Sequence, residues 1–547
     1  MLGGTRLSYA QGLSNTPLRD ETIGAMWDAV VARHGDREAI VSRRQGIRWT
    51  YDALHEQVTR CARGLLALGV DRGDRVGIWS PNNAEWVVVQ FATAKIGAIL
   101  VNINPSYGRH ELEYALRQSG CSVLVLATGF KDADYVELLH NVDAPALRER
   151  ILLGEAWGEL LARGDDVPVD ALRARETELD FDQPINIQYT SGTTGFPKGA
   201  TLSHHNIVNN GFFIGETLGY TPADRVCLPV PFYHCFGMVL GNLAIVTHGA
   251  CIVVPSDVFD PLAVLEAVAA ERCTSLYGVP TMFIAELDHP DFKKTGFSSL
   301  RTGIMAGSPC PVEVMKRVQS EMHMTEVTIC YGMTETSPVS AQTKRGTPLE
   351  TQVGTVGQVH PHVEVKIVDA ENRRTLPRGE TGELCTRGYS VMLGYWGDEE
   401  ATREVIDAAR WMHTGDLAVM DDEGYVNIVG RSKDMIIRGG ENIYPREIEE
   451  FLHTHPAIED VQVFGIPDKR YGEEVCAWVI VVDGAEPDEE EIRAFCRGRI
   501  ARYKVPRQIR FVDAFPLTVT GKVQKFRMRE YEIAERGLEA VAATRTA

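Results

Sequence analysis

The sequence lacks the features that would place it in a membrane or outside a cell. Its stretch most like a membrane span, residues 237–254, is interrupted by Asn242, Thr247 and the pair His248-Gly249, so a buried helix followed by a strand fits better. The first 25 residues also lack the apolar core of a secretory signal. We therefore expect a cytoplasmic chain without a transmembrane segment, and peripheral membrane contact stays open.

Paired cysteines and an excess of basic charge are missing as well. The eleven cysteines, an odd number without a Cys-x-x-Cys motif, indicate reduced thiols rather than a disulfide scaffold or a zinc ribbon. The 56 basic and 75 acidic side chains give a formal net charge of −19. Because such a chain repels polyanions, a nucleic-acid-binding function is disfavoured.

The chain is too long for one compact core, since single hydrophobic cores stop growing near about 250–300 residues. With 547 residues, at least two domains are expected. An amphipathic helix is predicted from Thr50 to Gly69, and residues 75–102 read as strand, helix and strand, with Asn83 as the helix cap. Such a βαβ unit predicts a parallel sheet.

A later segment echoes this unit. Asp-Arg-Val at 74–76 followed by Gly-Ala at 97–98 is matched by Asp-Arg-Val at 224–226 followed by Gly-Ala at 249–250. We interpret the echo as two related α/β halves whose ligand sites lie at the carboxyl ends of the strands. A chance similarity of common residues stays the alternative.

The pattern changes twice in the remainder of the chain. Residues 352–431 alternate in short runs between Gly- and Pro-rich turns, which predicts a small antiparallel β-barrel or sheet that closes the large domain. The elements predicted after it are a helix at 445–453, strands at 461–464 and 475–482, and a helix at 489–499. We therefore expect an α/β chain with a large N-terminal domain, 1–432, and a small mobile α+β domain, 433–547.

The most informative stretch is residues 190–199, Thr-Ser-Gly-Thr-Thr-Gly-Phe-Pro-Lys-Gly, which follows a predicted strand at 185–189. Glycines let the backbone approach a ligand, hydroxyls are rotatable donors and the lysine adds a cation, so the loop is suited to wrap phosphate oxygens. It is not a Walker A loop, because Pro197 precedes Lys198 and Gly199 follows it. A flexible surface loop, the alternative for such a composition, is disfavoured by the order of the residues.

This decamer closely resembles the signature loop of the acyl-adenylate-forming superfamily, which includes acyl-CoA synthetases, adenylation domains of peptide synthetases and luciferases. The flanking residues Asn-Ile-Gln at 186–188 and Ala-Thr-Leu-Ser-His at 200–204 are most similar to those of medium-chain fatty acyl-CoA ligases. Further stretches that extend the resemblance over nearly the whole chain lie at 306–309, 329–336, 414–416, 430–434 and 516–523.

The resemblance implies a nucleotide site. Tyr331 is expected to stack on adenine, Thr334 to lie at the α-phosphate and Asp416 to accept both ribose hydroxyls. Glu335 is the implied ligand of Mg²⁺, which commonly takes one or two carboxylates together with phosphate and water. Without the resemblance, Glu335 would be interpreted as solvated surface and Arg431 as part of an ordinary ion pair. The implied ATP- and AMP-binding residues are Thr190, Ser191, Gly192, Thr193, Thr194, Gly195, Lys198, Gly307, Ser308, Tyr331, Gly332, Thr334, Asp416, Arg431 and Lys522.

Residues 232–234, Phe-Tyr-His, lie where the superfamily lines the acyl pocket. No acidic residue occurs between Val226 and Ile252, so nothing there would hold the ammonium group of an amino acid substrate. The resemblance places His234 beside the substrate carboxylate, although a lone histidine is more often a core residue. The implied pocket residues, mainly apolar as a fatty acyl chain requires, are Phe232, His234, Met238, Tyr277, Val279, Met305 and Met333.

Lys522, within Pro-Leu-Thr-Val-Thr-Gly-Lys-Val at 516–523, is the implied catalytic cation. A carboxylate that approaches the anionic ATP needs such a charge at the reacting atoms. Lys433 is implied as the hinge of a rotating small domain, and Gly439-Gly440 as the loop that admits the pantetheine arm of CoA. Eleven basic residues and one acid between 493 and 529 either steer CoA phosphates or form a solvated face. The implied catalytic residues are Lys522, Thr194, Glu335 and His234.

The implied activity is ATP- and Mg²⁺-dependent formation of a fatty acyl-CoA, with medium-chain acids as substrates and an acyl-AMP intermediate. Fatty acid, ATP and coenzyme A are the implied ligands. Three alternatives stay open: an acyl-AMP ligase that loads a carrier protein, a CoA ligase for an aryl or other carboxylate, and a nucleotide-binding module without turnover. The last is disfavoured because binding alone would not need Lys522. The sequence leaves the oligomeric state open, a homodimer included.

Overall fold

The computed structural model describes residues 6–190, 197–308, 310–431, 434–438, 441–497, 499–517 and 523–543. The chain splits into two compact units. The large unit comprises Ala10–Val365 and Thr386–His413, and the small unit comprises Met1–Tyr9, Lys366–Cys385 and Thr414–Ala547. Two segments that the sequence assigns to the large domain, 366–385 and 414–432, therefore group with the C-terminal residues, and the predicted hinge Lys433 lies outside the described residues.

The first sheet of the large unit confirms the predicted βαβ unit. Its strand order is β21 (Gly394–Tyr395), β11 (Lys198–Ser203), β10 (Pro184–Thr190), β5 (Ile99–Ile103), β4 (Arg75–Trp79), β6 (Val123–Leu126) and β9 (Glu149–Leu152). Strands β4 and β5 are parallel, and α3 (Ala84–Ile96) connects them. The side chain of Asn83 caps α3 as predicted, since its Oδ1 accepts a hydrogen bond from the backbone N–H of Trp86 at 2.8 Å.

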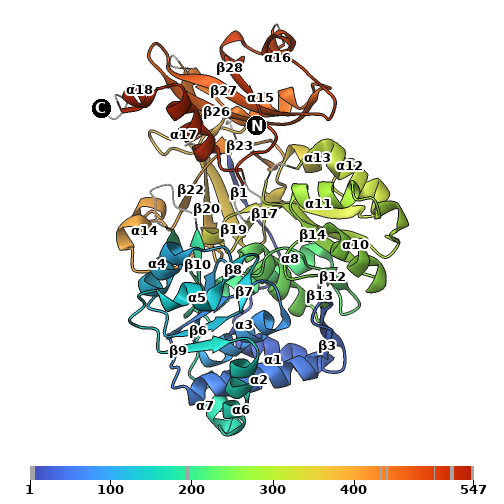
Figure 1. The fold of residues 1–547 in the computed structure, drawn as a ribbon, viewed down its shortest axis with the longest axis vertical. Coiled ribbons are helices and arrows are strands. Elements are labelled where there is room, and N and C mark those ends of the chain that lie inside the picture. Colours follow the sequence, from blue (N-terminus) through green and yellow to red (C-terminus); the bar gives the residue numbers. More distant parts are fainter. Residues whose placement is uncertain are drawn as a thin grey trace. The chain divides into compact units, whose positions relative to one another are not determined.

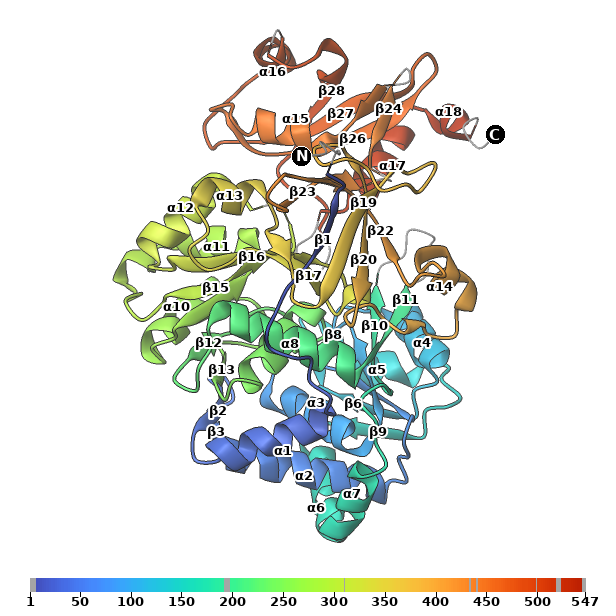
Figure 2. The ribbon, with the colours of Figure 1, turned by 180° about the vertical axis from the view of Figure 1, so that it is seen from behind.

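Helix α3 contacts β4 and β5 of this sheet and is almost completely buried, because further helices pack over it. The helix predicted over 50–69 is α2 (Tyr51–Ala67), which the Thr50 hydroxyl caps. It packs against α3 and against α6 (Glu155–Asp165). Figure 2 shows α2 and α6 gathered with α1 (Ile23–His34) and α7 (Val169–Glu176) at one end of the large unit.

The second sheet of the large unit has nine strands. Its order is β18 (Gln358–Val359), β17 (Val339–Gln342), β16 (Glu326–Gly332), β15 (Thr302–Ala306), β14 (Ser275–Gly278), β12 (Arg225–Cys227), β13 (Cys251–Val254), β2 (Glu38–Ser42) and β3 (Ile47–Thr50). Strands β13, β12, β14, β15 and β16 pair in parallel. Figure 1 shows α10 (Pro261–Ala270), α11 (Pro280–Leu287) and α12 (Val312–Glu321) grouped beside β12 and β14. Because strands β13, β12, β14, β15 and β16 are parallel, their carboxyl ends lie along one edge of the sheet.

The echo between the two halves has a structural counterpart. The backbone N–H of Ile99 donates to the Asp74 carbonyl at 2.7 Å, and that of Cys251 donates to the Asp224 carbonyl at 3.0 Å. Gly97 and Gly249, in matching places, have φ values of +71° and +67°. The connections differ, because residues 236–246 form a π-helix, η1 (Phe236–Leu243), continued by the short α9 (Ala244–Val246). The helix and strand predicted over 237–254 are nevertheless present, since β13 follows.

The small unit contains the predicted α+β elements. The helices and strands expected at 445–453, 461–464, 475–482 and 489–499 are α15 (Pro445–Leu452), β26 (Ile458–Asp468), β27 (Gly472–Val481) and α16 (Glu489–Cys496). Their sheet has the order β25 (Glu441–Ile443), β24 (Ile436–Arg438), β27 and β26, with β28 (Gln508–Phe511) paired to β27. Buried Ile436, Val463, Val475 and Ile492 belong to its core.

The region predicted as a small barrel or sheet contributes four strands to a five-stranded sheet, and a strand from the start of the chain supplies the fifth. Its order is β1 (Tyr9–Gln11), β19 (Val363–Val368), β20 (Gly382–Gly388), β22 (Met412–Met420) and β23 (Val426–Arg431). Strands β22 and β23 are antiparallel, as expected.

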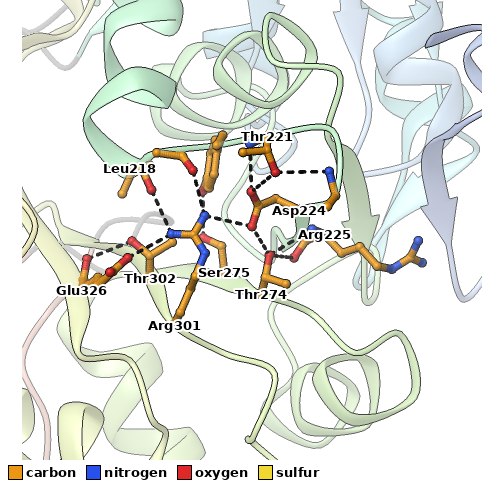
Figure 3. A network of polar contacts seen from close by, with 12 residues as sticks. Leu218, Thr221, Asp224, Arg225, Thr274, Ser275, Arg301, Thr302 and Glu326 are labelled. Carbon is orange, nitrogen blue, oxygen red and sulfur yellow. Dashed lines mark hydrogen bonds and ion pairs between the residues drawn. The ribbon is translucent and has the colours of Figure 1, made fainter.

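A polar network joins the amino ends of the parallel strands in the second sheet (Figure 3). Arg301 Nη2 donates to Asp224 Oδ1 at 2.9 Å, and Arg301 Nη1 donates to Glu326 Oε2 at 3.0 Å. The same guanidinium donates to the carbonyls of Leu218 and Gly219, at the end of α8 (His204–Leu218). Because orphan carbonyls at a helix end need donors, Arg301 ties α8 to this edge of the sheet.

Two predicted absences can be compared with the structure. None of the described helices has both the length and the apolar character needed to cross a bilayer. All eleven cysteines are free thiols, and all except Cys330 are buried.

Candidate active site

The predicted phosphate loop connects the two strands of a hairpin. Strands β10 and β11 pair antiparallel, and Thr190 with Lys198 is their last pair. Strand β10 also pairs in parallel with β5, so the loop follows the carboxyl end of a strand, where α/β sheets place ligands. Of the predicted loop residues, Thr190 and Lys198 are placed, whereas Ser191, Gly192, Thr193, Thr194 and Gly195 lie outside the described residues.

The acidic turn predicted for Mg²⁺ lies against this hairpin. Strand β16 leads into a 3-10 turn, η3 (Thr334–Thr336), in which Glu335 is 5 % exposed. Thr190 Oγ1 donates a hydrogen bond of 3.3 Å to Glu335 Oε1. The structure thus brings together two predicted site residues that are 145 positions apart.

Tyr395 is a third member of this contact, which the sequence interpretation missed. Its hydroxyl donates to the same Glu335 Oε1 at 2.9 Å, and Lys198 Nζ lies 5.2 Å from the centre of its ring. Burial, together with the Glu335 carboxylate, raises the pKa of Tyr395, so the hydroxyl keeps its proton and remains a donor. No local signal identifies Tyr395, because it reaches the site through the pairing of β21 with β11.

The two oxygens of the Glu335 carboxylate differ in their surroundings. Both hydroxyl donors meet Oε1, and no described side chain or backbone group hydrogen-bonds Oε2. A buried carboxylate with one oxygen left for a ligand is suited to Mg²⁺, which fills its remaining positions with phosphate and water oxygens. The residues present therefore fit a single-carboxylate magnesium site.

The slot predicted for adenine follows the next two strand ends. Strands β15 and β16 are parallel with Ala306 opposite Cys330, so Gly307 and Tyr331 follow side by side. Gly307, Ser308 and Gly332 are exposed. A Cβ on Gly332 would lie 1.7 Å from the Pro338 carbonyl oxygen, so only glycine fits there. The exposed backbone beside Tyr331 leaves space for a flat ring.

His234 has an ordered environment next to the η3 turn. Its Nδ1 accepts a hydrogen bond from the backbone N–H of Phe236 at 3.1 Å, which fixes the ring and assigns Nδ1 as the acceptor. The Sγ of the next residue, Cys235, lies 3.8 Å from Thr334 Oγ1. The residue that follows the predicted carboxylate-side histidine therefore contacts the predicted α-phosphate threonine.

Most of the predicted acyl-pocket residues share one apolar cluster. Phe232, Met238 and Tyr277 are buried in it, and Val279 and Met333 are half-buried against it. Met305 was predicted to line the same pocket, but it belongs to a different apolar cluster, together with Met315. Its neighbours Ile304 and Ala306 are in the first cluster, as the alternation of side chains along a strand requires. Met305 thus lies on the opposite face of the second sheet.

A ladder of hydrogen-bonded buried amides, which the sequence did not predict, lies next to Met238. Asn186 Nδ2 donates to Asn102 Oδ1 at 2.9 Å, and Gln188 Nε2 donates to Asn186 Oδ1 at 2.9 Å. Asn102 Nδ2 lies 3.5 Å from Met238 Sδ. Asn186, Gln188 and Thr190 are alternate residues of β10, so the ladder continues along one face of the strand to the Glu335 contact.

The small unit carries the two predicted ribose ligands. Asp416 and Arg431 are paired residues of β22 and β23, and Arg431 Nε lies 3.3 Å from Asp416 Oδ1. The Arg431 side chain is 65 % exposed, so the ion pair itself adds little stability. Lys433, Gly439, Gly440 and Lys522 lie outside the described residues.

Two family models match the chain. The model described as AMP-binding enzyme matches residues 27–396, and the AMP-binding enzyme C-terminal domain matches residues 447–522. The chain is 48 % identical over 534 residues to the putative acyl-CoA synthetase YngI of Bacillus subtilis (strain 168), covering 94 % of this chain and 97 % of YngI. It is 47 % identical over 557 residues to the mitochondrial medium-chain acyl-CoA ligase ACSF2 of Danio rerio, covering 97 % and 91 %.

Two solved structures of similar proteins contain ATP or an acyl-adenylate. ATP-bound MatB from Rhodopseudomonas palustris superimposes with a TM-score of 0.84 at 29 % identity, over 93 % of this chain and 98 % of that chain. The anthranilate CoA ligase AuaEII in complex with anthranoyl-AMP gives a TM-score of 0.81 at 27 % identity, over 94 % and 98 %. Since the family model spans more than half of the sequence and close relatives align over nearly all of it, the chain belongs to the AMP-binding enzyme family.

Proposed function

We propose that this chain is an ATP-dependent acyl-CoA synthetase that converts a medium-chain fatty acid, ATP and coenzyme A into acyl-CoA, AMP and pyrophosphate. The observation that carries the proposal is the contact between Thr190, at the edge of the phosphate loop, and Glu335, in the acidic turn. The names of relatives at 47–48 % identity support the substrate class.

In the first half-reaction, a carboxylate oxygen of the fatty acid attacks the α-phosphorus of ATP and pyrophosphate leaves. We assign Lys522 as the cation that offsets repulsion between the two anions, Thr194 and Thr334 as phosphate ligands, and His234 as the neighbour of the carboxylate. Glu335 would hold Mg²⁺, which when bound supplies positive charge to the phosphates. Tyr395 and Thr190 hold the Glu335 carboxylate in place through its other oxygen.

In the second half-reaction, the CoA thiol attacks the acyl carbonyl carbon, its proton is lost and AMP leaves with the bonding electrons. The proposal assigns Gly439-Gly440 to the passage of the pantetheine arm and Lys433 to the pivot of the C-terminal domain. A Lys433→Pro variant is accordingly expected to slow thioester formation more than adenylation, since proline restricts the backbone at the pivot. Equal slowing of both steps would contradict the pivot.

The acyl pocket is proposed to be built on the cluster that contains Phe232, Met238, Tyr277, Val279 and Met333. Each CH₂ group that such a surface takes from water contributes about 0.8 kcal/mol to binding, which favours a fatty acid over a small polar acid. We also propose that the enzyme works in a reducing compartment such as the cytoplasm, where its eleven free thiols are stable.

The test is a panel of acids from short to long chains, with aromatic acids included, in which pyrophosphate release and CoA thioester formation are both measured. Medium-length fatty acids are expected to drive both reactions. Pyrophosphate release without acylation of CoA would indicate a different acceptor, such as a carrier protein. If only aromatic acids are converted, the substrate is an aryl carboxylate rather than a fatty acid. If no acid is converted, the proposal is contradicted.

A further inference from the structure

Two adjacent carboxylates at the start of β27 are buried in the small unit. Glu473 and Glu474 are 4 % and 3 % exposed. Glutamates are seldom so buried without partners of opposite charge, because the desolvation of a carboxylate is costly. Both have such partners, and both reach the same short strand, β24.

Glu474 binds the last residue of that strand. Arg438 donates to its carboxylate from Nε at 2.6 Å and from Nη2 at 3.0 Å, a bidentate pair. Arg507 Nη1 lies 3.4 Å from the same carboxylate. The Arg438 guanidinium also lies 4.2 Å from the centre of the Tyr471 ring. Arg438 is therefore held by an anion and an aromatic face together.

Glu473 binds the residue before it. One of its oxygens accepts the backbone N–H of Ile437 at 2.7 Å, and the other lies 3.2 Å from Arg529 Nη2. The strand pairing between β24 and β27 contains a single register pair, Arg438 with Gly472. Side chains of β27 thus supply much of the attachment of β24 to the sheet.

The Glu474–Arg438 ion pair, called the anchor below, lies directly before two glycines in the chain. Strands β24 and β25 pair antiparallel, with Arg438 opposite Glu441 as the last pair, and the two residues between them are Gly439 and Gly440. Glycines have no side chain with which to fix their own position and lose the most conformational entropy on ordering. Arg438 is thus the side chain nearest to them on the entering strand that can hold the loop in place.

We propose that Glu474, acting through Arg438, is a positioning residue for thioester formation. It holds Arg438 at the end of β24, next in sequence to the Gly439-Gly440 pair to which the proposed function assigns the pantetheine arm. The inference rests on the proposed function, in which this loop serves the second half-reaction. Since adenylation does not use the loop, loss of the anchor slows thioester formation alone.

The test separates the two half-reactions in Glu474→Gln and Arg438→Gln variants. Octanoate-dependent exchange of pyrophosphate into ATP measures adenylation, and single-turnover reaction of octanoyl-AMP with CoA measures thioester formation. We expect exchange within about twofold of wild type and a thioester rate lowered about tenfold, since a charge-assisted hydrogen bond is lost. The double variant is expected to be no slower than either single one, because both remove the same contact. Arg438→Lys, which keeps the charge without the bidentate geometry, should recover part of the rate.

The matched control is Glu450→Gln in α15. Glu450 forms an ion pair of 2.7 Å with Arg446 in the same unit, but its side chain is 61 % exposed. Neither rate is expected to change in this variant. If Glu474→Gln does not fold, Arg438→Gln carries the test, because Glu474 keeps Arg507 as a partner.

An unchanged thioester rate in the variants, or an equal loss of both half-reactions, overturns the inference while the proposed function stands. A wild-type protein that catalyses neither half-reaction with octanoate or any other acid removes the proposed function and this inference together.

Discussion

The hydroxyl of Tyr395 donates a hydrogen bond of 2.9 Å to Glu335 Oε1, although the two residues are 60 positions apart. The donor is carried by β21 and the acceptor by the turn after β16, so each reaches the contact from a different sheet. Because the Tyr395 hydroxyl keeps its proton, it remains a hydrogen-bond donor to this carboxylate oxygen. The contact therefore selects one orientation of the proposed magnesium ligand.

Tyr395→Phe is expected to lower the kcat/KM of pyrophosphate release for Mg·ATP about tenfold and to raise the Mg²⁺ concentration needed for half-maximal rate. A hydrogen bond to a charged group contributes about 1.5–3 kcal/mol, and about 1.4 kcal/mol corresponds to a factor of ten. Titration with Mn²⁺ in the presence of a non-hydrolysable ATP analogue checks metal affinity without turnover. Tyr135→Phe, which removes a hydroxyl that donates to the Pro105 carbonyl at 2.6 Å, is the control. Equal metal affinity in wild type and Tyr395→Phe would contradict the role.

Asp224→Ala is expected to destabilise the large unit by about 3 kcal/mol. Asp224 is 4 % exposed and pairs with Arg301 at 2.9 Å. Its removal takes one of two acidic partners from Arg301, which keeps Glu326, and takes the acceptor from the backbone N–H of Thr221. Urea unfolding followed by tryptophan fluorescence measures the change. Glu321→Ala, which breaks a half-exposed pair with Arg317 at 2.9 Å and leaves Arg317 paired with Asp288, should cost less than about 1 kcal/mol. A similar cost in both variants would show that the network adds nothing beyond a surface pair.

Acid is expected to destabilise the protein through His360. This side chain is 2 % exposed, and burial lowers the pKa of His360 to about 3. The unfolded histidine titrates near 6.5, so the unfolded state binds a proton that the folded state refuses as the pH falls from 6.5 toward 3. At pH 5 this linkage costs about 2 kcal/mol relative to pH 7.

His360→Phe keeps an aromatic ring and removes the titration. The loss of unfolding free energy between pH 7 and pH 5 should shrink by that amount in the variant. His323→Phe, at an exposed position, serves as the control. An unchanged pH dependence in His360→Phe would mean that other groups account for the acid sensitivity.

Glu286 is expected to destabilise the protein as the pH rises, which is the opposite pH dependence to that of His360. The side chain is fully buried in α11, neither carboxylate oxygen has a hydrogen-bond partner among the described residues, and burial raises the pKa of Glu286. An unfolded glutamate ionises near pH 4.5, so stability falls as the pH rises from there toward the raised pKa.

Glu286→Met is expected to raise the free energy of unfolding at pH 8 by about 1–3 kcal/mol, because a buried polar group without a partner is replaced by an apolar one. Urea midpoints at pH 5 and pH 8 give the measurement. The exposed Glu313→Met is the comparison, and a gain of the same size there would contradict the argument.

Local signals in the sequence were sufficient for most elements. The helix over Tyr51–Ala67 has a regular apolar stripe, and the one over Ala84–Ile96 has an asparagine cap, so both were predictable from nearest neighbours along the chain. The repeated Asp-Arg-Val and Gly-Ala were predictive because both Asp carbonyls accept the same kind of backbone hydrogen bond. The resemblance to known enzymes supplied the site residues that no periodicity could give.

Contacts set by strand pairing were not predictable. Tyr395 meets Glu335 only because a two-residue strand pairs with β11, and nothing in its own neighbourhood indicates a site. Met305 was assigned to the wrong face because a buried strand is apolar on both sides, so its sequence does not reveal which side faces the pocket. The π-helical winding over Phe236–Leu243 has the same limit, since every residue of the segment is buried and no amphipathic stripe reveals its period.

Because nearly all of the thiols are buried, the rate at which each cysteine is alkylated reports the opening of the structure around it. Burial raises the pKa of Cys61 and Cys476, so these thiols are both shielded and unreactive while the fold is closed. Cys476 and Cys496 belong to the small unit, whereas Cys61 and Cys227 belong to the large one. A pulse of alkylating reagent followed by peptide mass mapping would therefore date the unfolding of each unit separately within one sample, without any added probe.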